Sequence, residues 1–180
     1  IPGEEMVRII ETCAERGVYV LTDEIYFYFV YPPAEEFTAA VLPAELRESV
    51  CIAGGFSKTF AMTGWRIGYT IAPQAWTRAI LKLQSHSSTH PTSFVQYACA
   101  KAMQDSGRTL TAIRSMLTEY EKRKNWFVPA LNAIDGIRCR DPQGAFYAFV
   151  DVRELIGPQF ANSAAVAEHL LHEAHTVVTD

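Results

Sequence analysis

The amino-acid sequence predicts an α/β protein with a mainly parallel sheet, followed by a smaller α+β part. Three short, nearly all-apolar runs carry this prediction, at residues 18–21, 50–53 and 66–72. Runs of this kind suit strands that are buried on both faces of a parallel sheet. Stretches with the apolar period of a helix separate the runs, as in alternating α/β folds.

The helices are predicted from their periodicity and their stop signals. Residues 4–16 carry apolar side chains at helical spacing, and Gly17 supplies a C-terminal stop. Residues 83–92 are polar and contain Pro91, so we expect a loop there. The helical period returns at Phe94, breaks or kinks at residues 105–107, and resumes from about residue 110 to residue 133.

The last third has a different pattern. Residues 136–140 and 145–151 are expected as two strands, joined by a turn that holds Pro142 and Gly144. A helix is expected at 163–174, and a strand at 176–180. The predicted organisation is therefore residues 1–95 as an α/β domain, 96–133 as connecting helices, and 134–180 as a small α+β domain.

Composition excludes several classes of protein. The chain has 180 residues, 49% of them hydrophobic, and a formal net charge of −4, which argues against a nucleic-acid partner. No apolar run is long enough to cross a membrane. The four cysteines, at positions 13, 51, 99 and 139, form no CxxC pair, so we expect reduced thiols and a cytoplasmic protein. No metal site is expected, since His169, His172 and His175 have no carboxylate or thiolate partner and fit an exposed helix face.

The two ends of the sequence suggest a piece of a longer polypeptide. Ile1 is not an initiator Met, and a lone terminal strand needs pairing partners.

The densest chemical signal is the segment from Ser57 to Tyr69, which follows a predicted strand and two glycines. It reads SKTFAMTGWRIGY. Glycine-rich turns expose N–H groups that bind phosphate, and Arg66 adds a bidentate cation for the same group. Lys58 supplies an amine that can form a Schiff base with an aldehyde.

Asp23 and Tyr26 follow the strand predicted upstream, where ligands of open α/β sheets bind. A carboxylate there can pair with a protonated pyridine nitrogen. Structural alternatives stand beside these interpretations. Asp23 could cap a turn, Tyr26 could be a packing residue in an aromatic run, and Ser57 could cap the turn that follows it.

These motifs resemble the class I/II aminotransferases of fold type I, which depend on pyridoxal 5'-phosphate (PLP). The resemblance rests on Asp-Glu-x-Tyr at residues 23–26 and on the lysine segment. The Gly-Ala-Phe-Tyr stretch at 144–147 and the loop at 90–96 support it. It implies the PLP-dependent transferase type I fold, with part of the large PLP-binding α/β domain and part of the small C-terminal domain in this chain.

The resemblance also implies roles by position. Lys58 forms the Schiff base with PLP, Asp23 binds the pyridine nitrogen, and Tyr26 donates to the phenolic oxygen. Arg66 and Ser57 hold the phosphate. One position departs from the family pattern: many relatives have a phosphate-binding Ser three residues before the lysine, where this chain has Gly55.

The implied partners are an amino acid and a 2-oxo acid as substrates, and a second subunit in a homodimer. The family's upstream phosphate loop, stacking aromatic and Asn-Pro motif are not in the sequence, nor is its substrate-carboxylate arginine. We therefore expect these 180 residues alone to be inactive. Two alternatives stay open: a PLP lyase of the same fold (a β C–S lyase or a cyclopropane-forming synthase), and the PLP-binding effector domain of a transcription regulator.

Overall fold

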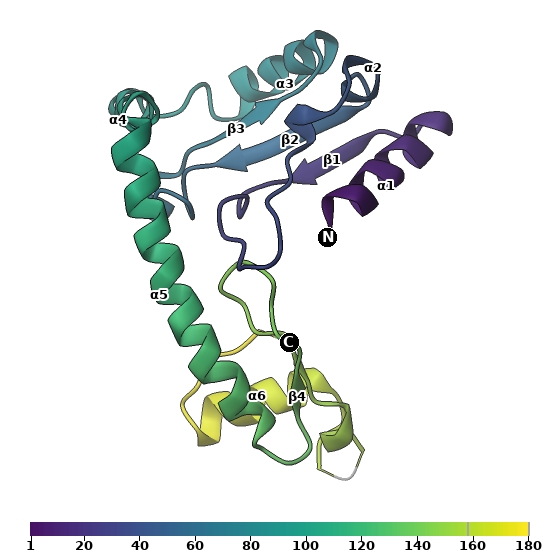
Figure 1. The fold of residues 1–180 in the computed structure, drawn as a ribbon, viewed down its shortest axis with the longest axis vertical. Helices are drawn as coiled ribbons and strands as arrows, with labels where there is room; N and C mark the ends of the chain where they lie inside the picture. Colours follow the sequence, from purple (N-terminus) through teal and green to yellow (C-terminus); the bar gives the residue numbers. More distant parts are fainter. Residues whose placement is uncertain (158, 180) are drawn as a thin grey trace. The chain divides into compact units, whose positions relative to one another are not determined.

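The computed structural model describes residues 1–157 and 159–179, and these form two compact units. The first unit holds Ile1–Glu119 together with Gln143–Ala145. The second holds Tyr120–Pro142 and the described residues from Phe146 onward. Figure 1 labels helices and strands of both units.

The first unit is built on a three-stranded sheet in the order β1-β2-β3. Strand β1 (Val20–Asp23) pairs in parallel with β2 (Val50–Gly55). Strand β3 (Gly68–Ile71) pairs with the other edge of β2 and is antiparallel to it (Figure 1). The expected strand at 66–72 is therefore confirmed as a strand, but it is antiparallel to its neighbour and shorter than predicted.

Strand burial differs from the expectation of strands covered on both faces. β2 is mostly buried, whereas Leu21 of β1 and Ile71 of β3 are exposed in this chain. Within the described chain, β1 and β3 are the outer strands of the sheet, and an outer strand has a neighbour on one side alone.

Helix α1 (Gly3–Glu15) covers one face of β1 and β2. Ile10 of α1 is fully buried and packs in one cluster with Val50 and Ile52 of β2. Burying one side chain of this size stabilises a fold by roughly 1.5–3 kcal/mol. The predicted stop is confirmed: Gly17 has φ +67°, and Val18 N–H donates to the carbonyl of Cys13 over 2.8 Å.

The remaining elements of the first unit are mainly helical. They are η1 (Ala39–Val41), α2 (Ala44–Arg47), η2 (Thr63–Trp65), α3 (Gln74–Ser87), α4 (Ser93–Gln104) and the first part of α5 (Ser106–Asn132). The break predicted at residues 105–107 is confirmed, since α4 ends at Gln104 and α5 begins at Ser106.

The loop predicted at 83–92 is wrong over its first half, because α3 continues to Ser87. The polar residues that suggested a loop form the last turns of this helix. Ser85 and Ser87 satisfy their hydroxyls by donating to carbonyls three residues earlier, at 2.9 and 3.3 Å.

The second unit contains the end of α5, β4 (Arg138–Cys139), β5 (Val150–Asp151), η3 (Arg153–Leu155) and α6 (Ser163–Glu173). β4 and β5 are antiparallel, with Cys139 opposite Val150. The predicted helix at 163–174 is confirmed, and Asn162 caps it by accepting from Ala165 N–H over 2.9 Å.

Three strand predictions in this part of the chain are corrected. The strands expected at 136–140 and 145–151 shrink to two residues each. Gly144 instead forms an isolated bridge with Val30 in the first unit, and Ala145 has φ +58°, so the chain does not extend there. Residues 176–179 are not a strand, because Thr176 N–H bonds back to the carbonyl of Leu170 in α6. Residue 180 lies outside the described residues.

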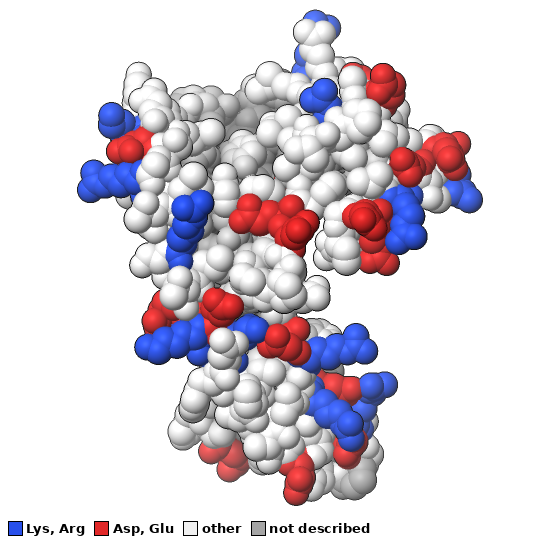
Figure 2. All heavy atoms as spheres, viewed as in Figure 1, with Lys and Arg blue, Asp and Glu red and all other residues white. Residues whose placement is uncertain are grey.

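The surface carries charged side chains of both signs, together with exposed large apolar side chains such as Leu21 and Ile71. On the face drawn in Figure 2, basic and acidic side chains are interspersed. None of the described helices is both long and apolar enough to cross a membrane. Of the four thiols, which are all unpaired, those of Cys51, Cys99 and Cys139 are buried, and burial raises the pKa of each.

Candidate active site

The topology of the sheet gathers the predicted site residues at one end, which we call the carboxyl edge. It is the end at which β1 and β2 finish and β3 begins. Asp23 is the last residue of β1 and lies opposite Ala53, while Gly55 at the end of β2 lies opposite Gly68 at the start of β3. The turns that follow β1 and β2, and the residues that precede β3, therefore leave the sheet at the same edge.

The turn after β1 carries Asp23 and Tyr26. Asp23 is exposed, and its Oδ1 accepts from Ile25 N–H over 3.1 Å. Phe27 N–H donates to the carbonyl of Glu24 over 3.0 Å, which closes the turn around Tyr26. Asp23 therefore stabilises the turn, as in the structural alternative, through Oδ1. Its Oδ2 has no role in that turn.

The turn after β2 carries Ser57 and Lys58, both half-buried. Ala61 N–H donates to the carbonyl of Lys58 over 3.1 Å, and the preceding Phe56 is buried in a cluster with Val95 and Cys99 of α4. The lysine side chain is therefore carried by a turn with a buried anchor. Its Nζ lies 5.9 Å from the centroid of the Tyr26 ring, within the range of a cation–π contact.

Arg66 lies between η2 and β3 with a left-handed backbone, φ +53°. Residues other than glycine seldom adopt this conformation, and such outliers gather at functional sites. The guanidinium is exposed and donates to the carbonyl of Thr63 over 2.9 Å. Arg66 thus stands at the carboxyl edge with one hydrogen bond to its own loop.

The glycines at the carboxyl edge lie so close to neighbouring atoms that a Cβ atom would clash. A Cβ on Gly54 would lie 2.5 Å from the ring of Tyr69, and one on Gly68 would lie 2.9 Å from the carbonyl oxygen of Gly54. At Gly55, where many aminotransferases have Ser, a Cβ would meet Cδ1 of Ile25 at 2.8 Å. Ile25 therefore occupies the space that a larger residue at position 55 would need.

The sequence did not indicate the role of Glu24, which is half-buried next to Asp23. Its Oε1 accepts from Ala39 N–H at 2.9 Å and from the Thr22 hydroxyl at 3.2 Å. In the sequence, the one indication of a role for Glu24 was its position directly after a predicted strand. The contact with Ala39 could not be predicted, because Ala39 is 15 residues away and donates through its backbone N–H.

A second feature that the sequence did not indicate is the docking of Gln143–Ala145 onto the segment after Tyr26. Ala145 N–H donates to Phe29 O over 2.7 Å, and Tyr31 N–H donates to Gln143 O over 2.9 Å. A Cβ on Gly144 would lie 2.6 Å from the Phe29 carbonyl oxygen, so this approach requires glycine. The first two residues of the Gly-Ala-Phe-Tyr stretch are thus held by hydrogen bonds and close packing against residues 29–31 of the first unit.

No group of three or more His, Cys, Asp or Glu side chains in residues 1–157 and 159–179 is arranged to hold a metal ion. The chemistry available at the carboxyl edge is that of an amine, a phenol, a carboxylate and a guanidinium.

Comparisons with known proteins agree on one family. The profile described as "Aminotransferase class I and II" matches residues 1–180. An aspartate aminotransferase of Streptomyces avermitilis is 36% identical over 180 residues, covering 97% of this chain and 43% of that protein. The aromatic-amino-acid aminotransferase 2 of Thermococcus litoralis is 35% identical over 175 residues, again 97% of this chain and 43% of that protein.

Among solved structures, an aromatic aminotransferase from Pyrococcus horikoshii superposes with a TM-score of 0.90 at 34% identity. The match covers 99% of this chain and 46% of that one. The α/β fold of the chain is thus that of part of the type I aminotransferase structures. The chain spans a little under half the length of the relatives it matches.

Proposed function

The chain belongs to the class I and II aminotransferases, and we propose that the complete protein is a PLP-dependent enzyme that moves an amino group between an amino acid and a 2-oxo acid. The observation that carries the proposal is the carboxyl edge, where Lys58 Nζ lies 5.9 Å from the centroid of the Tyr26 ring, Asp23 ends β1 and Arg66 precedes β3.

The side chains at the edge fit PLP in kind. An amine can hold an aldehyde covalently, a phenol can donate to a phenolate oxygen, and a carboxylate can pair with a pyridinium nitrogen. A guanidinium binds phosphate in two-point fashion. When bound, PLP supplies an electron sink that stabilises negative charge on the substrate α-carbon.

The chain's own residues then have separate tasks in this proposal. Lys58 would hold the cofactor through its amine, and the free amine would move a proton at the substrate α-carbon as a general acid–base group. Asp23 keeps the ring nitrogen protonated, and Tyr26 fixes the ring by its phenol. Arg66 binds the phosphate, assisted by Ser57 and by the backbone N–H groups near Gly55.

The large domain, the connecting helices and the small domain are proposed at residues 1–95, 96–133 and 134–180. We also propose a cytoplasmic homodimer. The unpaired thiols, three of them buried, support a reducing compartment.

The named relatives guide the choice of substrates to assay. The complete polypeptide that carries these residues, supplied with PLP, is expected to convert 2-oxoglutarate to glutamate with aspartate or with an aromatic amino acid. Release of ammonia, or of a β-substituent, without amino transfer would contradict an aminotransferase and favour the lyase. A Lys58→Ala variant is the negative control, and Lys82→Ala in α3 is the matched lysine that should leave the rate unchanged.

A further inference from the structure

The Glu24 side chain joins the turn that carries Tyr26 to the hydrophobic core. Ala39, whose N–H donates to Glu24 Oε1, is fully buried in the cluster that holds Ile10, Val50 and Ile52. The second donor, Thr22, is also buried. One carboxylate oxygen therefore satisfies two buried donors, one on β1 and one on η1.

Glu24 is held by its backbone as well. Its N–H donates to the carbonyl of Ala53 over 2.8 Å, one position beyond the last pair of the β1–β2 ladder. Its own carbonyl accepts from Phe27 N–H and so closes the turn around Tyr26. Glu24 is thus the residue at which the sheet ends and the turn begins.

The two neighbouring site residues depend on this junction to different degrees. Asp23 is a strand residue and is held by its pairing with Ala53. Tyr26 lies two residues beyond Glu24, outside the ladder, and its place follows from the turn and from its ring contact with Phe29 at 6.4 Å. A change at Glu24 should therefore displace Tyr26 more than Asp23.

The charge of Glu24 also acts on Tyr69, the last residue of the lysine segment. The Tyr69 ring lies against Gly54, next to the strand end from which Lys58 follows. Partial burial, and after it the negative charges of Glu24 and Tyr28, raise the pKa of the Tyr69 phenol. Glu24 thus interacts electrostatically with Tyr69 of β3, in addition to its hydrogen bonds with Thr22 of β1 and Ala39 of η1.

We propose that Glu24 is a positioning residue, which sets the place of the Tyr26 phenol relative to Lys58 by tying the turn after β1 to the buried N–H of Ala39. The inference rests on the proposed function, because it concerns how the chain presents Tyr26 to PLP. It assigns Glu24 no contact with cofactor or substrate.

The test is a double-substitution cycle on PLP affinity in the complete protein, measured by titrating the cofactor-free form. Glu24→Ala is expected to weaken PLP binding about tenfold, the effect of losing roughly 1.4 kcal/mol. Tyr26→Phe should weaken it by a similar factor. If Glu24 acts through Tyr26, the double variant should be no weaker than Tyr26→Phe alone.

Two further variants separate positioning from general damage. Glu24→Gln keeps the Oε1 acceptor and should stay within about threefold of the parent, since the two donors keep their partner. Thr38→Ala removes the hydroxyl that accepts from Ala40 N–H at the start of η1, and so loosens the same helix without touching Glu24. PLP affinity should be unchanged in this control.

The outcomes are distinct. Additive losses in the double variant, an equal loss in Thr38→Ala, or a Glu24→Gln variant as weak as Glu24→Ala would each overturn the inference. Failure of the proposed function has another signature, because the parent protein itself would then bind no PLP, or would bind it without transferring an amino group.

Discussion

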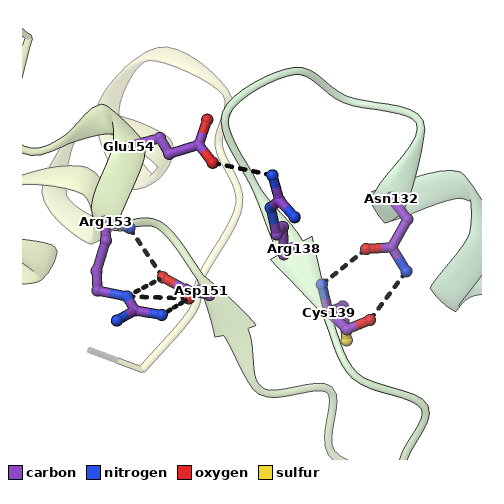
Figure 3. A network of polar contacts seen from close by, with 6 residues as sticks. All are labelled: Asn132, Arg138, Cys139, Asp151, Arg153 and Glu154. Atoms are coloured by element: carbon purple, nitrogen blue, oxygen red, sulfur yellow. Dashed lines mark hydrogen bonds and ion pairs between the residues drawn. The ribbon is translucent and has the colours of Figure 1, made fainter.

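The carboxyl edge of the first unit and the two-stranded sheet of the second are held in different ways. The edge is supported by an apolar cluster behind it, and its chemically active side chains project from turns. The β4–β5 pair has two residues per strand and is surrounded by side-chain hydrogen bonds and ion pairs, drawn in Figure 3. In the first region an apolar core supports turns that carry the polar side chains, whereas in the second the polar side chains hold the short strands by their contacts with one another.

The contacts of the second unit illustrate this engagement. Asn132 at the end of α5 donates to the carbonyl of Cys139 and accepts from its N–H, at 2.9 and 2.8 Å. The Asn132 side-chain amide thus makes the pair of hydrogen bonds to β4 that the backbone of a neighbouring strand would otherwise make. Arg138 pairs with Glu154 at 3.3 Å, and Asp151 binds Arg153 through its guanidinium and its backbone N–H (Figure 3). The four charged residues of these ion pairs, Arg138, Asp151, Arg153 and Glu154, also line a cavity of about 410 Å³.

Among substitutions that should leave PLP bound, the largest effect on function is expected at the exposed Asp23. Asp23→Ala should lower the turnover number by roughly 10²–10³-fold, the effect of losing one electrostatic contact that stabilises charge developing in the reaction. Steady-state assays of amino transfer measure it, with PLP content as the control for binding. Near-normal turnover would show that the turn is the whole role of Asp23.

A substitution in the hydrophobic core next to the carboxyl edge should lower the stability of the protein. Ile10→Ala is expected to lower the free energy of unfolding by about 2–5 kcal/mol, because Ile10 is fully buried against β2. Urea unfolding followed by circular dichroism measures the change. Ile9→Ala is the matched control, since Ile9 is 41% exposed on the same helix and should change much less.

A smaller loss is expected at the Asn132 amide. Asn132→Ala leaves both backbone groups of the buried Cys139 without this partner, which costs about 1–3 kcal/mol. Hydrogen exchange of the peptide around Cys139 should accelerate accordingly. Asn162→Ala, which removes one helix cap, should cost about 1 kcal/mol and leave the exchange at Cys139 unchanged.

The smallest effect is expected at the Asp151–Arg153 pair. Hydrogen bonds from Arg153 lower the pKa of Asp151 from 3.8 to about 2. Because the folded value is depressed, any stabilisation from this group is present above pH 3.8 and is lost as the pH falls toward 2. In Arg153→Met the pKa should rise toward 3.8, and in Arg138→Met it should move less, as measured by carbon-13 NMR of labelled aspartate. An unchanged value in Arg153→Met would contradict the assignment.

The two regions also differ in how far the sequence predicts them. The helix Gly3–Glu15 with its stop at Gly17, and the positions of Asp23 and Lys58 after strands, were predictable because periodicity, stop signals and a dense motif are local. The roles of Asp23 and Lys58 stay predictions. The extent of the strands near Ala145 was not, since Gly144 pairs with Val30 more than a hundred residues away. The contact of Glu24 with Ala39 was hidden for a similar reason, because one partner is a backbone N–H that no residue type reveals.

The most direct test concerns the proposal that Lys58 at the carboxyl edge holds PLP. The complete protein should be loaded with PLP, reduced with borohydride and digested, and the modified peptide identified by mass spectrometry. We expect a pyridoxyl group on Lys58, and no such adduct in Lys58→Ala. An adduct on Lys82 or on another lysine of the parent protein would contradict it.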